Sequence, residues 1–159
     1  SEKEAEEISD IALGRPGVAL DLISDKEKLE NFNQRIRELN KISNSPFYFR
    51  FQYVKNLVKE DKSSFPPSPR PALRGRGSVA EDLENIKDTL DIWLNYFRSI
   101  LLSRFLPASP SLQPKDENFD KYSTIKIKNI INHIQTTKFL LSSTNINTKL
   151  ALERLILEM

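Results

Sequence analysis

The sequence predicts an all-α protein, a helical bundle with two long irregular loops, on three observations. Apolar residues recur at intervals of three and four along most of the chain, which is the spacing of one face of a helix. Residues that favour helix starts precede several of these segments. No segment carries a convincing strand signal. The fold class that remains is a bundle of helices packed on a shared core.

Composition sets the outer limits of this prediction. The chain has 159 residues, which suits one domain or one domain with a fragment of another. Apolar residues are 38% and charged residues 29%, as in ordinary soluble globular proteins. The net charge of +2 gives no global electrostatic argument for nucleic acid or membrane partners. The chain has no cysteine, which excludes disulfides, thiolate zinc sites and cysteine nucleophiles within it.

The sequence shows neither a membrane-spanning segment nor a signal peptide. No apolar run approaches the roughly 20 residues that cross a bilayer, and we expect no membrane partner. The opening residues SEKEAEEISD are acidic and polar, unlike a signal peptide. The chain starts at Ser1 without an initiator methionine. We therefore expect it to be cut from something longer.

The first segment, residues 2–13, predicts a helix rich in glutamate and alanine. Its apolar positions Ile8, Ile11 and Ala12 are spaced for one face. A four-residue motif interrupts it: Gly14, Arg15, Pro16 and Gly17. Pro16 suits the first turn of a new helix, so residues 18–23 predict a short apolar helix.

Two further helices follow in the first half of the chain. Ser24 and Glu27 match a capping box and predict a helix start. Ser45 followed by Pro46 predicts another, by the same logic of a cap before a first-turn proline. The apolar stripe of the first is Leu29, Phe32, Ile36 and Leu39. That of the second is Phe47, Phe51, Val54 and Val58, with Tyr48, Phe49 and Tyr53 on its flanks.

Residues 62–77, KSSFPPSPRPALRGRG, predict a loop or linker because proline and glycine oppose both helix and strand. Arg70, Arg74 and Arg76 make this loop basic. A solvated loop is the plain interpretation. A phosphate-contacting arm and a proline-rich ligand segment are the alternatives.

The second half predicts three helices. The longest runs from a capping box at Ser78 and Glu81 to about Leu106, where Pro107 ends it and a second loop, 107–120, begins. Its apolar face contains Leu83, Ile86, Leu90, Trp93, Leu94, Phe97, Leu101 and Phe105. Residues 123–143 predict the next helix, although the opening TIKIK alternates like a strand. The last helix is expected to start at Asn147, a favourable N-cap.

The last helix is apolar on more than one side. Leu152, Leu155, Ile156 and Met159 share one face, while Leu150 and Leu157 lie seven residues apart on another. Burying each such side chain contributes on the order of 2 kcal/mol. We expect the second side to meet another chain. A helix buried centrally in a monomer is the alternative.

Residues with catalytic chemistry are nearly absent. The single histidine, His133, lies between Ile131 and Ile134 with no cysteine or acidic residue at metal-ligand spacing, so a structural or exposed role is expected. The segment GRPG is too short for a phosphate-binding loop and lacks the lysine that would follow. We predict no enzyme activity, no cofactor and no metal.

Two stretches resemble a known family. ALGRPGVALDLI is similar to the helical lid segment of bacterial DNA polymerase III clamp-loader subunits, in particular the delta-prime type. LDIWLNYFRSILLSR and the closing residues 130–159 resemble the C-terminal collar domain of the same subunits. An asparagine turn leading into a leucine-rich helix matches the collar's usual ending. The basic loop at 62–77 is longer than the family pattern.

The resemblance implies a division of the chain and a function. Residues 1–24 would be the end of the lid, and 25–159 the collar, which joins a pentameric ring that supports sliding-clamp loading in DNA replication. Partners would be other loader subunits (gamma/tau and delta), with the sliding clamp and primer-template DNA met only indirectly. The implied location is the bacterial cytoplasm. Implied interface residues are Asn145, Asn147, Leu150, Arg154 and Leu157.

One departure from the family bears on activity. ATP-hydrolysing relatives carry an arginine shortly after the lid glycine. Aligned on Gly14, that place holds Gly17 here, and Arg15 stands two residues earlier. The departure fits a subunit that does not itself hydrolyse ATP. The alternative function is a helical nucleic-acid-binding module that uses the basic loop.

Overall fold

The computed structural model describes residues 8, 12, 16–58, 76–105, 122–143 and 145–159. Every regular element within these residues is an α-helix, so the predicted all-α bundle is confirmed. The elements are α2 (Pro16–Ser24), α3 (Lys26–Ser43), α4 (Phe47–Leu57), α5 (Arg76–Phe105), α6 (Thr124–Ser143) and α7 (Thr148–Glu158). Ile8 and Ala12 of the predicted first helix are helical and buried. Nearly all of the two predicted loops lies outside the described residues.

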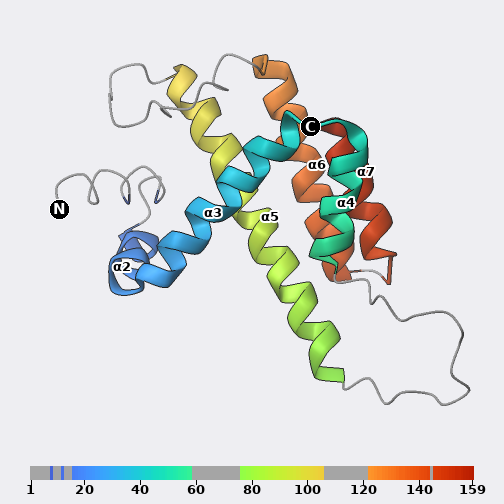
Figure 1. Cartoon of the computed structure of the whole chain (residues 1–159). Coiled ribbons are helices and arrows are strands. Elements are labelled where there is room, and N and C mark those ends of the chain that lie inside the picture. The colour runs from blue at the N-terminus through green and yellow to red at the C-terminus, as the bar shows by residue number, and fades with distance from the viewer. Residues whose placement is uncertain (1–7, 9–11, 13–15, 59–75, 106–121, 144) are drawn as a thin grey trace, which may run out of the picture.

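The long helix α5 organises the molecule (Figure 1). It packs against α3 on one side and α6 on another, and α6 in turn packs against α7. Helix α4 packs against both α7 and α3 and so connects the two ends of this series. Helix α2 packs on α3, at the end of α3 far from α4, α6 and α7 (Figure 1). None of the helices in the described ranges combines the length and apolar character needed to cross a membrane.

The core lies where α5 meets its neighbours. Trp93, Phe97 and Ile100 of α5 are fully buried. The same core holds Leu39 of α3, Val54 of α4, Ile127, Ile130 and Ile134 of α6, and Leu152, Leu155 and Ile156 of α7. The predicted stripe of α5 is therefore largely confirmed, from Ile86 through Phe97. The predicted stripe omits Tyr96 and Ile100, which are buried as well. A helix that packs against neighbours on two sides buries a wider arc of its surface than a single stripe.

Two predicted helix starts are wrong by one residue. Ser24 ends α2, and Asp25 caps α3 instead, with Oδ1 accepting from the backbone N–H of Lys28 at 3.2 Å. Ser45 does not cap α4. Its hydroxyl donates to the carbonyl of Lys41 at 2.6 Å, and Pro46 occupies the N-cap. In both places the serine belongs to or bonds to the preceding helix, so the next residue occupies the N-cap position.

The start of α5 also differs from the prediction. The helix begins at Arg76, so Ser78 stands inside it, and Arg76 and Gly77 belong to the helix rather than to the loop. By contrast, α6 ends at Ser143, as predicted, and begins at Thr124, one residue after the predicted start. The hydroxyl of Ser123 accepts from the backbone N–H of Lys126 at 3.2 Å and caps this start. The alternating TIKIK is helical.

Two residues placed on apolar stripes are exposed. Phe47 is 56% exposed and does not belong to the core; the guanidinium of Arg50 lies over its ring, 5.2 Å from the ring centre. Phe105 is the last residue of α5 and is 67% exposed. Tyr48 and Phe49, expected on the flanks of α4, are exposed as well, and their rings meet edge to face at 5.5 Å.

Candidate association surface

Helix α7 starts at a side-chain cap, as the sequence predicts. The side-chain oxygen Oδ1 of Asn147 accepts from the backbone N–H of Leu150 at 3.2 Å. The Asn147 carbonyl then accepts from the N–H of Ala151 at 3.1 Å, the first bond of the helical ladder. This arrangement satisfies one of the N–H groups that a helix start leaves without an intrahelical partner. It fixes where α7 begins.

The two faces of α7 have opposite environments. Leu152, Leu155 and Ile156 are almost completely buried against the core, and Met159 is 4% exposed. Leu150 is 62% exposed and Leu157 is 51% exposed. Residues seven apart lie on nearly the same side of a helix, so the two exposed leucines share one face. We call the side formed by Leu150, Arg154 and Leu157 the outer face of α7.

The five implied interface residues are only partly brought together. Leu150, Arg154 and Leu157 stand at intervals of four and three and form the outer face. Arg154 is exposed and makes no hydrogen bond or ion pair to another described residue. Asn147 is exposed, but its side-chain oxygen is engaged in the cap. Asn145 is exposed in the turn before α7.

A groove runs between α6 and α7 beside the outer face. Its volume is about 500 Å³. Leu150 and Arg154 line it from α7, and Thr136 and Leu140 line it from α6. The other lining residues are His133, Thr137, Ile146, Asn147, Ala151 and Leu155. The sequence does not predict this groove, because it forms from two helices that pack side by side.

His133 lines the groove and stands near a carboxylate of α7. It is half-buried, and its Nε2 stands 3.9 Å from a carboxylate oxygen of Glu158 on α7. The contact becomes an ion pair only when the imidazole is protonated. Across the described ranges, no three or more histidine, cysteine, aspartate or glutamate side chains gather as a metal site would require.

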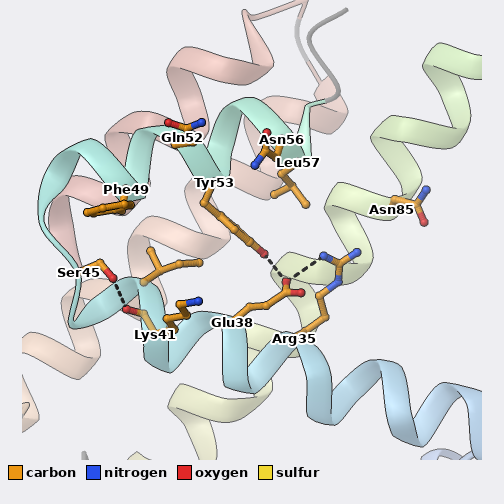
Figure 2. A pocket seen from close by; sticks show the side chains of 11 residues that line it. Arg35, Glu38, Lys41, Ser45, Phe49, Gln52, Tyr53, Asn56, Leu57 and Asn85 are labelled. Carbon is orange, nitrogen blue, oxygen red and sulfur yellow. Dashed lines mark hydrogen bonds and ion pairs between the residues drawn. The ribbon is translucent and has the colours of Figure 1, made fainter.

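A second groove, of about 650 Å³, lies between α3 and α4 and reaches α5 at Asn85 (Figure 2). Glu38 stands inside it, and one carboxylate oxygen accepts from Arg35 at 3.2 Å and from the Tyr53 hydroxyl at 3.0 Å. The Tyr53 ring stacks on Trp93 with ring centres 6.2 Å apart. The pKa of Tyr53 is raised well above its ordinary value. Burial is the largest cause, and the negative charge of Glu38 is the second.

The polar side chains inside the second groove form a network that links two helices. Its one carboxylate is already paired, and its tyrosine is held in the neutral form by burial. The Arg35, Glu38 and Tyr53 network joins α3 to α4. Sequence reasoning misses it, because fifteen residues separate Glu38 from Tyr53.

The implied lid motif is only half described. Pro16 begins α2 and is exposed, and Gly17 is exposed in its first turn. A Cβ added at Gly17 would meet nothing within 4 Å, so packing within this chain does not require glycine there. Gly14 and Arg15 lie outside the described residues, as do Arg70 and Arg74 of the basic loop. The side chain of Arg76 is also not described.

Neither protein-family models nor curated proteins nor solved structures provide a match to the chain.

Proposed function

We propose that the chain is a non-catalytic assembly domain, the collar of a clamp-loader subunit of the delta-prime type, preceded by the end of its lid. In this function the outer face of α7 packs against the collars of neighbouring loader subunits in a bacterial cytoplasm. The domain supports sliding-clamp loading by holding the ring together and hydrolyses no ATP itself. The motifs at residues 12–23 and 130–159 support the family.

One observation carries the assembly role. Leu150 and Leu157 stand exposed on the outer face, although α7 has already buried a complete apolar face in the core. Covering an exposed leucine removes apolar surface from water, which contributes on the order of 1 kcal/mol for a side chain that is half exposed. An arginine flanked by apolar side chains is also typical of residues that dominate protein interfaces. The outer face thus has the composition of a contact surface.

The test is assembly with the other loader subunits of the same organism. The chain is mixed with gamma/tau and delta, and the mass of the products is measured by size-exclusion chromatography with light scattering. We expect a complex that contains the chain. Leu157→Asp should weaken it by at least about tenfold, because the interface would bury an unpaired carboxylate.

Leu20→Asp is the matched control. Leu20 is an exposed leucine, 67% accessible, on α2, which lies far from α7 (Figure 1). This variant should assemble like the unchanged chain. Absence of a complex would refute the proposal. Equal weakening by both substitutions would show that the outer face of α7 has no special role.

A further inference from the structure

The groove between α6 and α7 has an apolar base beside the outer face. Leu140, Ile146 and Ala151 line it while they remain partly accessible, and Leu155 beneath them is 1% exposed. Leu150 also lines the groove and is exposed to solvent. A helix of a partner protein can place a side chain between two such helices, because ridges on one helix fit grooves on another. The shape therefore fits an apolar side chain.

The ionisable side chains that line the groove are all of the basic type. The ionisable residues that line it are His133 and Arg154, and no acidic residue lines it. Glu158 stands near one end, 3.9 Å from His133. Glu153 and Lys149 are also on α7 but do not line the groove. Arg154 has no ion-pair partner among the residues that the structure describes. An arginine in this state offers a planar pair of donors to a carboxylate.

We propose that this groove receives an acidic amphipathic helix of a neighbouring subunit. The helix would place a leucine or isoleucine against Leu140 and Ala151 and, one turn away, an aspartate or glutamate against Arg154. Apolar contact would provide affinity, and the single ion pair would select the partner. This inference rests on the proposed assembly function and adds the chemistry of the partner.

The probe is a fluorescent alanine-rich peptide of about 16 residues, long enough to form a helix. It carries two leucines seven residues apart with glutamates one turn from each. A second peptide has lysine in place of each glutamate. Binding of both to the full chain is measured by fluorescence anisotropy. We expect the glutamate peptide to bind at least about fivefold more tightly, with the preference shrinking at high salt.

Variants assign the preference to the groove. Arg154→Gln should remove it, and Glu153→Gln, the adjacent neutralisation, should leave it in place. Leu150→Ala should weaken both peptides alike. Circular dichroism of each variant should match the unchanged chain, since these side chains are not in the core. Binding of neither peptide, equal binding of both, or a preference that survives Arg154→Gln would overturn the inference. So would sedimentation showing that the chain dimerises and that Leu157→Asp dissociates the dimer.

Failure of the inference and failure of the proposed function are distinguishable. If loader subunits bind in a Leu157-dependent manner but the peptides show no preference, the groove chemistry is wrong and the assembly role stands. If the peptides show the preference but no loader subunit binds, the acidic-helix groove stands and the clamp-loader assignment fails.

Discussion

Arg50 and Ile156 join α4 to the end of α7, with the guanidinium Nη1 donating to the Ile156 carbonyl at 3.2 Å. The same guanidinium donates to the carbonyl of Ser43 at 2.9 Å, and its Nε donates to Ser45 at 2.9 Å. Carbonyls in the last turn of a helix have no intrahelical donor. Arg50 therefore completes the C-terminal ends of α3 and α7 together, and it holds α7 at the end that carries Leu157.

Arg50→Met should lower the free energy of unfolding by about 2–3 kcal/mol, because three carbonyls lose a charged donor. Arg37→Met, an exposed arginine on α3, should change it by less than about 0.5 kcal/mol. Urea denaturation monitored by circular dichroism provides both values. Equal stability of the two variants would show that the Arg50 contacts contribute nothing.

The two faces of α7 should differ in their contribution to stability. Leu152→Ala removes a fully buried side chain and should cost about 2–5 kcal/mol. Leu157→Ala, on the outer face, should cost less than about 1 kcal/mol in the isolated chain. The same denaturation measurement compares them. A cost of several kcal/mol for Leu157→Ala would mean that this leucine belongs to the chain's own core.

The N-cap of α7 can be tested by replacing two asparagines, Asn147 and Asn145, one at a time. Asn147→Ala should destabilise the chain by about 1 kcal/mol, because the N–H of Leu150 loses its side-chain acceptor. Asn145→Ala lies two residues earlier in the same turn and provides the control, which should be close to neutral. Thermal unfolding of the two variants distinguishes them. A neutral Asn147→Ala would remove the cap from the account of how α7 starts.

Tyr53 should make stability fall in alkaline solution. Its pKa is raised in the folded chain, so the native state keeps the proton above pH 10.0, the ordinary value, where the unfolded chain loses it. The stabilisation is complete below that pH and declines above it, by at most about 1.4 kcal/mol per pH unit.

Tyr53→Phe is the comparison for this titration, since the other tyrosines and the lysines contribute equally to both chains. Urea midpoints measured between about pH 9 and pH 11 should fall more steeply for the unchanged chain than for Tyr53→Phe. Parallel declines would show that Tyr53 ionises in the folded chain as readily as in the unfolded one.

Local sequence patterns predict a helix and its cap well where a single residue is the clear candidate for the cap. The bounds of α6, the cap at Asn147 and the buried and exposed faces of α7 all follow from spacing along one segment. The N-cap of α3 is at Asp25 rather than Ser24 because two suitable residues are adjacent there, and Ser45 does not cap α4 because its hydroxyl bonds back to Lys41 of α3.

Features that join distant segments could not be predicted in this way. The groove beside α7 requires knowing which side of α6 packs on it. The pairing of Glu38 with Tyr53, and of Arg50 with a carbonyl 106 residues away, depends on tertiary packing. The outer face was predicted because it is an excess of apolar residues on one helix, a property that the sequence contains directly.

The most direct measurement uses the chain's lack of cysteine. Single variants Leu157→Cys and Leu20→Cys are alkylated with and without the other loader subunits, and the chain's modification is followed by mass spectrometry. Our account predicts that the partners slow alkylation of Leu157→Cys by at least about tenfold and leave Leu20→Cys unchanged, because only the outer face of α7 becomes covered. An unchanged rate for Leu157→Cys in an assembled complex would contradict it.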